Sequence, residues 1–159
     1  MFEQQASGTD RAGLRADLLA AADAITRDEP DMTANMANIS ALLTLYLPDL
    51  NWAGFYRVVG DELVLGPFQG RPACVRIAHG KGVCGTAWAS GETQLVPDVH
   101  AFPGHIACDA ASRSELVVPL FQKGDVCGVI DLDSPTPARF DSDDARCIEQ
   151  LARLLESRF

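Results

Sequence analysis

Residues 114–134, with the sequence SELVVPLFQKGDVCGVIDLDS, decide the fold class of this chain. Two runs rich in β-branched residues flank the tripeptide KGD, a pattern typical of a β-hairpin with its turn at the tripeptide. A second hairpin is predicted upstream, where Trp52–Val59 and Glu62–Phe68 lie on either side of a Gly-Asp turn. The two strands of a hairpin run antiparallel, so the sequence predicts an antiparallel sheet.

Helices are predicted on both sides of these hairpins along the chain. Three longer segments are expected to be helical: 9–27, 32–45 and 142–157. Thr9 is the expected N-cap of the first helix, and Asp141 or Ser142 that of the last. Shorter elements are expected between the hairpins: a strand at 72–77, a helix at 82–92 and a loop at 97–112. Helices around two hairpins indicate an α+β domain, with the helices packed on the sheet.

Length and charge limit the classes of function. A chain of 159 residues is expected to form one domain with one ordinary core. Its 13 Lys and Arg against 22 Asp and Glu give a formal net charge of -9, which repels nucleic acid and anionic lipid. The chain shows no signal-peptide pattern, and no run approaches the roughly 20 apolar residues of a membrane span. The sequence therefore predicts a cytoplasmic protein.

The second strand of the 114–134 hairpin carries two carboxylates. Strand alternation predicts that Asp131 and Asp133 share one face with Cys127, while Ile130 and Leu132 share the other. The carboxylates are either solvated at the end of the strand or line a pocket. In a pocket, like charges at this spacing need a cation between them, and an ammonium group is suitable. A pocket would therefore imply a ligand that carries an amine.

Three further residues allow a structural and a functional interpretation. Trp52 and Tyr56 share one face of their strand, where they are either core residues or a wall for an apolar or sulfur-containing group. Glu115 starts a strand, where it is either an exposed end or a proton donor whose pKa is raised by partial burial. The residues themselves leave these alternatives open.

The five cysteines form an odd set in a chain predicted to be cytoplasmic, where thiols stay reduced. Cys127 and Cys147 lie in strand and helix patterns and are interpreted as buried apolar residues. Cys108 lies in the loop sequence GHIACDAAS, with His105 before it and small residues after it that leave room for a substrate. A nearby imidazolium could lower the pKa of this thiol, so Cys108 is a candidate reactive cysteine.

A metal site is the chemical alternative for this part of the chain. The candidate ligands are Cys74, His79, Cys84, His100, His105 and Cys108. Their spacings match none of the tight pairs that structural zinc sites use, so the sequence predicts no metal. The glycines around Lys81 also match neither of the common phosphate-binding motifs.

Five segments together resemble the free methionine-(R)-sulfoxide reductases, a family of single GAF domains. They are NWAGFY (51–56), GPFQGRPAC (66–74), GKGVCGTAW (80–88), DVHAFPGHIACDAASRSE (98–115) and GVIDLDSP (128–135). The resemblance extends from about residue 30 to 157, which predicts an N-terminal helical segment over 1–30 and a GAF domain over 31–159. It implies a six-stranded antiparallel sheet with helices packed on it, a small closed pocket and a homodimer, with no cofactor.

The resemblance also implies the catalytic roles. Cys108 would attack the sulfoxide sulfur while Glu115 protonates the departing oxygen, which leaves a sulfenic acid on Cys108. Cys74 and Cys84 would be the candidates that condense with it to a disulfide, Cys74 before Cys84. Thioredoxin would then reopen the disulfide.

The substrate-binding residues follow from the same resemblance. Asp131 and Asp133 would hold the substrate ammonium group, and Trp52 and Tyr56 would surround the methyl sulfoxide. Because the GAF fold is shared by proteins without catalytic activity, the alternative function is a sensor that binds a small molecule, or that responds to oxidants, without turnover.

Overall fold

The structure is a computed structural model that describes residues 10–106 and 109–158. Its elements are α1 (Arg11–Thr26), α2 (Met32–Tyr46), β1 (Trp52–Val59), β2 (Glu62–Gly70), β3 (Arg76–Ala78), α3 (Gly82–Ser90), β4 (Gln94–Val96), a short 3-10 helix (Val99–Ala101), β5 (Ser114–Gln122), β6 (Asp125–Ser134) and α4 (Ser142–Glu156). The strands form one six-stranded antiparallel sheet in the order β3-β2-β1-β6-β5-β4. The predicted α+β architecture is confirmed. Within the described residues, no helix has the length and apolar character needed to cross a bilayer.

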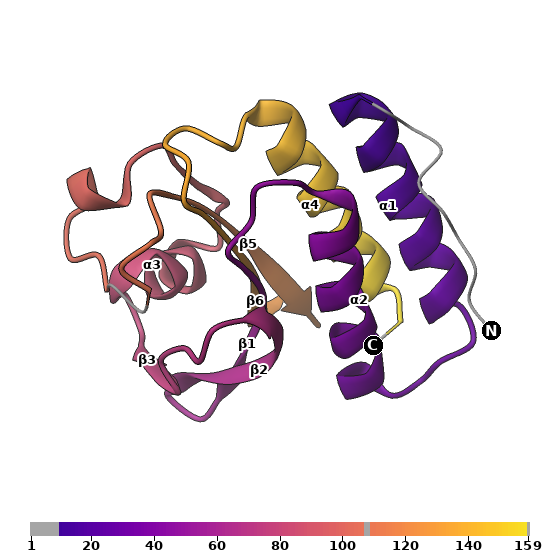
Figure 1. Ribbon diagram of the computed structural model, residues 1–159. Helices are drawn as coiled ribbons and strands as arrows, with labels where there is room; N and C mark the ends of the chain where they lie inside the picture. Colours follow the sequence, from indigo (N-terminus) through magenta and orange to yellow (C-terminus); the bar gives the residue numbers. More distant parts are fainter. Residues whose placement is uncertain (1–9, 107–108, 159) are drawn as a thin grey trace.

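The sheet separates two apolar clusters. Figure 1 shows α1, α2 and α4 on one side of the sheet and α3 on the other. Phe55, Ile130 and Leu132 point into the cluster beneath the three helices. Trp52 and Tyr56 point into the cluster on the α3 side. The alternation predicted for these five residues is therefore confirmed, and it directs Asp131 and Asp133 toward the α3 side of the sheet.

The helix caps agree only in part with the prediction. The α1 helix is capped by Asp10, whose carboxylate accepts a hydrogen bond from the Gly13 amide at 2.8 Å, while Thr9 lies outside the described residues. Asp141 caps α4 as expected, and it forms a reciprocal capping box with Asp144. In both helices the sequence located the N-cap to within one residue, and the hydrogen bonds of the structure show which residue it is.

The short elements differ more from the prediction. The strand expected at 72–77 begins four residues later and covers Arg76–Ala78. The helix α3 ends at Ser90, two residues earlier than expected, because Gly91 adopts a left-handed conformation with φ of 67°. The strand β4 lies just before the segment predicted to be a loop, and it was not predicted from sequence. It has only three residues, so its apolar pattern is too short to read, and its pairing with β5 comes from the tertiary fold.

The predicted orientation of Cys127 is wrong. The β5–β6 register pairs Leu120 with Gly128 but Phe121 with Val126, so β6 contains one extra residue at this point. Such a bulge breaks the strict alternation of side chains. Cys127 accordingly packs against the cluster beneath the helices, on the opposite side of the sheet from the two aspartates.

Candidate active site

A cavity lies against the face of the sheet that α3 covers. Its wall contains six of the eight residues predicted as site residues: Trp52, Tyr56, Cys84, Glu115, Asp131 and Asp133. Cys74 is partly buried next to this wall, in the segment between β2 and β3. Cys108 lies outside the described residues. The strands β1, β5 and β6 and the start of α3 thus bring most of the predicted residues to one place.

The strand register explains why the acidic side chains meet. Asp133 of β6 lies directly opposite Glu115 of β5 on one side and Trp52 of β1 on the other. Asp131 lies two residues away on the same face, opposite Gly54 of β1. Neighbouring strands are about 4.8 Å apart, so three carboxyl groups crowd one wall of the cavity.

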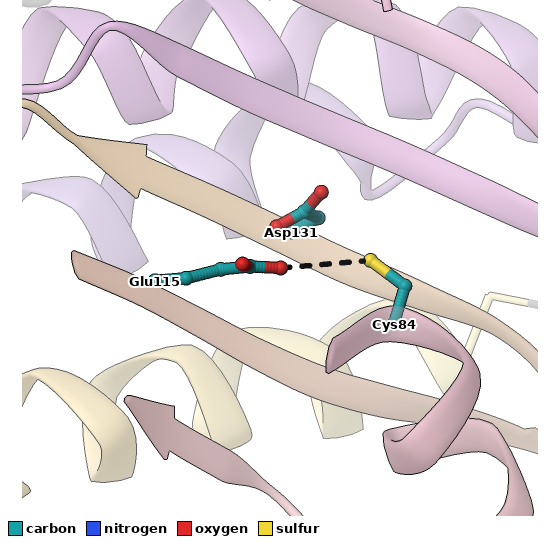
Figure 2. A group of neighbouring side chains, drawn as sticks. All are labelled: Cys84, Glu115 and Asp131. Carbon is teal, nitrogen blue, oxygen red and sulfur yellow. Dashed lines mark hydrogen bonds between the residues drawn. The ribbon is translucent and has the colours of Figure 1, made fainter. Parts of the chain in front are cut away.

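A thiol completes the acidic cluster. Figure 2 shows Cys84 reaching from the start of α3 toward Glu115, with Asp131 beside both groups. The Cys84 thiol donates a long hydrogen bond to Glu115 Oε1 at 4.0 Å. One atom of each of the three residues that could ligate a metal lies within 4.8 Å of the corresponding atoms of the other two. These groups could hold a metal ion, and they form a different set from the cysteines and histidines considered from sequence. The Asp131 carboxylate interacts with Cys84 and Glu115, while its Oδ1 atom has no hydrogen-bond partner among the described residues.

Burial changes the protonation of the cluster. It raises the pKa of Asp131 to about 7, and it raises the pKa of Glu115 and of Asp133 well above the usual range, with the charge of Asp131 adding to both shifts. Burial also raises the pKa of the Cys84 thiol, so this cysteine is protonated at neutral pH. Several carboxylates cannot ionise together in this space unless a positive group enters it.

The two predicted aromatic residues have a second role in the structure. Trp52 stacks on Tyr56 at 5.9 Å between ring centroids and on Phe68 at 5.2 Å, which forms an apolar wall. The Trp52 indole N–H donates to the Arg71 carbonyl at 3.2 Å, and the Tyr56 hydroxyl donates to the Cys74 carbonyl at 2.9 Å. The same rings therefore line the cavity and fasten the segment that carries Cys74.

Asn51 and Ser112 belong to the site but were not identified from sequence. Asn51 Nδ2 donates to Asp109 Oδ2 at 3.1 Å and to Ser112 Oγ at 3.0 Å, and Ser112 is hydrogen-bonded to Asp133. These contacts connect the segment after Cys108 to the residue before β1 and to the end of β6. They join residues 58 and 61 positions apart, so no local pattern in the sequence could have revealed them.

His105 contacts the acidic cluster. The sequence associated this histidine with Cys108, and the structure places its Nε2 atom 3.7 Å from Glu115 Oε2. Burial lowers the pKa of His105, which favours the neutral imidazole at neutral pH. His105 is thus a partner of the candidate proton donor.

The described cysteines fall into three groups. Cys74 is in a disulfide, whereas Cys84, Cys127 and Cys147 are free thiols. Cys127 and Cys147 pack in the cluster beneath the helices, which confirms their interpretation as packing residues. Cys84 is the free thiol that faces the cavity.

Known proteins are similar to this chain in both sequence and fold. The GAF domain family matches residues 7–159. The free methionine-R-sulfoxide reductase of Escherichia coli is 52% identical over 141 residues, which cover 89% of this chain and 86% of that protein. The enzyme of the same name from Saccharomyces cerevisiae is 44% identical, with 87% and 81% covered. A crystal structure of free methionine-R-sulfoxide reductase from Neisseria meningitidis in complex with its substrate superposes with a TM-score of 0.97 at 48% identity, covering 100% of this chain and 96% of that one.

Proposed function

Because this chain belongs to the GAF domain family, and within it to the free methionine-R-sulfoxide reductases, we propose that it reduces free L-methionine-(R)-sulfoxide to L-methionine with its cysteine thiols. The cavity is the observation that carries this proposal. It combines an aromatic wall, a buried acidic cluster and a neighbouring segment with a cysteine. A zwitterionic amino acid with a sulfur-containing side chain fits these three features.

In the first step, the Cys108 thiolate attacks the sulfoxide sulfur and Glu115 donates a proton to the oxygen. The oxygen passes to Cys108, methionine leaves, and Cys108 becomes a sulfenic acid. The raised pKa of Glu115 supports its role, because the carboxyl group then holds its proton at neutral pH. Sulfur is reduced in the substrate and oxidised in the cysteine, so no further electron carrier is needed in this step.

In the second step, the Cys74 thiol condenses with the sulfenic acid, which releases water and forms a disulfide. The participation of Cys74 in a disulfide supports it as the resolving cysteine. The burial and raised pKa of Cys84 make it the weaker candidate, since the thiolate is the reactive form. Thioredoxin, a dithiol reductant of the cytoplasm, then reduces the disulfide by exchange and resets the enzyme.

Selectivity for the free amino acid follows from the clamp formed by Asp131 and Asp133. The substrate ammonium group would bind between them and donate a hydrogen bond to Asp131 Oδ1, which has no partner among the described residues. A methionine sulfoxide inside a peptide brings an amide instead, which leaves buried carboxylates unpaired at a cost of about 2–5 kcal/mol. The protein should therefore act on free methionine sulfoxide and not on oxidised proteins.

The test is NADPH oxidation in an assay coupled to thioredoxin and thioredoxin reductase. Three substrates are compared: free methionine-R-sulfoxide, its S epimer and the N-acetylated R-sulfoxide. We expect turnover of the free R epimer alone, and none of it with Cys108→Ser. If the reduced, folded protein turns over none of them, the reductase function is wrong and the cavity belongs to a sensor that binds its ligand without chemistry.

A further inference from the structure

The proposed substrate carries a second charge that the clamp does not explain. A free amino acid has an α-carboxylate on the same carbon as its ammonium group. Four acidic residues line the cavity: Asp109, Glu115, Asp131 and Asp133. A carboxylate that enters beside them is repelled unless a cation faces it. The inference that follows rests on the proposed function and identifies this cation.

Two cavity-lining residues within the described part of the chain carry a permanent positive charge, Arg71 and Lys81. Neither the Arg71 guanidinium nor the Lys81 ammonium group makes a hydrogen bond or ion pair to another described residue. Arg71 is attracted by Asp109, but the Asp109 carboxylate already accepts hydrogen bonds from Asn51 and from the Ala111 amide. The Arg71 guanidinium is therefore free to receive a ligand.

The sheet register places Arg71 near the ammonium clamp. Gly70, the last residue of β2, lies opposite Trp52 of β1, and Trp52 lies opposite Asp133 of β6. Arg71 follows Gly70 directly, and its carbonyl is held by the Trp52 indole at 3.2 Å. Its backbone is thus about two strand spacings, or roughly 10 Å, from that of Asp133. Both residues line the same cavity, and the long side chain of Arg71 makes it possible for one small zwitterion to bridge this separation.

Lys81 lacks such a connection to the clamp. It precedes the first residue of α3, in the turn where its amide bonds to the Ala78 carbonyl, and no strand pairing relates it to Asp133. Its ammonium group is also a point charge, whereas the planar guanidinium of Arg71 can donate two parallel hydrogen bonds to a carboxylate. Both position and chemistry favour Arg71.

We propose that Arg71 binds the α-carboxylate of the substrate and is a specificity-determining residue. The protein then recognises both ends of the free amino acid, with the carboxylates of β6 at the ammonium group and Arg71 at the carboxylate. Methionine sulfoxide at the N-terminus of a peptide keeps its ammonium group but has lost its carboxylate. Arg71 is the residue that would reject it.

The experiment compares free L-methionine-R-sulfoxide with its α-amide, which keeps the ammonium group and removes the negative charge. Wild-type protein, Arg71→Gln and, as matched control, Lys81→Gln are assayed with both substrates. In Arg71→Gln, we expect kcat/KM for the free acid to fall about 10-fold or more, mainly through KM, because a charge-assisted hydrogen bond is lost. For the amide, kcat/KM should stay within about 2-fold, so the acid-to-amide ratio collapses. The ratio should persist in Lys81→Gln.

A ratio unchanged in Arg71→Gln, or one that collapses only in Lys81→Gln, overturns the proposal. Calorimetric binding of L-methionine and L-methioninamide to the same proteins needs no turnover, so it tests the carboxylate contact even if the reductase function fails. There, Arg71→Gln should lose the preference for the acid. Retention of that preference contradicts the assignment, while failure of the coupled assay alone contradicts only the proposed function.

Discussion

Asp131 shows how one buried residue can depend on a ligand. Its side chain is 6% exposed, one of its oxygens has no hydrogen-bond partner among the described residues, and burial raises its pKa to about 7. An isolated carboxylate in this position is costly, whereas one beside an ammonium group is stabilised. The ionised form of Asp131 is therefore disfavoured by burial and would be stabilised by an ammonium ligand.

The clamp is tested by Asp131→Asn combined with Asp133→Asn. We expect KM for free methionine-R-sulfoxide to rise by about 30-fold or more, because the ammonium group loses both charge partners. The rate at which iodoacetamide modifies the thiols of the reduced protein should change far less. Asp125→Asn, at the exposed turn between β5 and β6, is the control and should leave KM unaltered. An unaltered KM in the double variant would show that the ammonium group binds elsewhere.

Stability should depend on pH through Asp131. Its pKa is about 7 in the folded protein against about 3.9 for an exposed aspartate, so between these pH values the folded state binds more protons than the unfolded state. The free energy of unfolding therefore decreases as pH rises from 4 to 7, and the loss persists above pH 7.

Asp131→Asn should remove this loss, raising the free energy of unfolding by about 2 kcal/mol at pH 8 and by little at pH 4.5. Urea denaturation of the reduced protein at both pH values measures this difference. An equal effect at the two pH values would contradict the role of burial, and Asp125→Asn again serves as the exposed control.

At the scale of elements, Asp144 connects α4 to the rest of the helical layer. It is 2% exposed and accepts hydrogen bonds from Arg11, Arg15 and Arg139, in addition to its part in the capping box of Asp141. One carboxylate thus joins α1, the segment before α4 and α4 itself. Removing it would leave Arg139, which is also buried, without its charge partner.

Asp144→Ala should lower the free energy of unfolding by about 3 kcal/mol or more, because an uncompensated charge stays buried. The neighbouring Asp143→Ala is the matched control: its side chain is half exposed, and its loss should cost less than about 1 kcal/mol. Chemical denaturation followed by circular dichroism measures both. Equal effects would mean that the buried network contributes no more than a surface ion pair.

The connection between β1 and the Cys74 segment allows a test of the resolving step. Tyr56→Phe keeps the aromatic wall and removes only the hydroxyl that donates to the Cys74 carbonyl. In a single turnover without reductant, methionine release should be nearly unaltered, while disulfide formation should slow by about 3- to 10-fold, the equivalent of one hydrogen bond. Quenched samples analysed for methionine and for free thiols separate the two steps. Equal slowing of both would assign the hydroxyl to substrate binding instead.

At the scale of the whole molecule, the resemblance predicts a homodimer of the 17.1 kDa chain. Light scattering coupled to size-exclusion chromatography should give twice this mass. Each copy has a net charge of -9, so mutual repulsion should make the dimer dissociate first at low ionic strength. A mass of one chain at every protein and salt concentration would contradict the prediction.

Much of this architecture could be predicted from sequence because it depends on local geometry. The alternation of β6 follows from the covalent chain, which directs Asp131 and Ile130 to opposite faces wherever the strand is regular. Hairpin turns and amphipathic helices are likewise local, and they were predicted in the right order. The resemblance to a family assigned roles to eight residues. Six of them line one cavity, and Cys108 lies outside the described residues.

Only the tertiary structure decided the properties that depend on distant partners. The orientation of Cys127 depends on a bulge against β5, and the burial of Glu115 depends on α3, which brings Cys84 onto it. The position of Arg71 beside the clamp depends on the register of three strands. Sequence therefore determined which reactive side chains the protein has and which side chains share a face of each regular strand. Strand register and burial determined which of them meet and in which protonation state, because these depend on contacts between residues far apart in the chain.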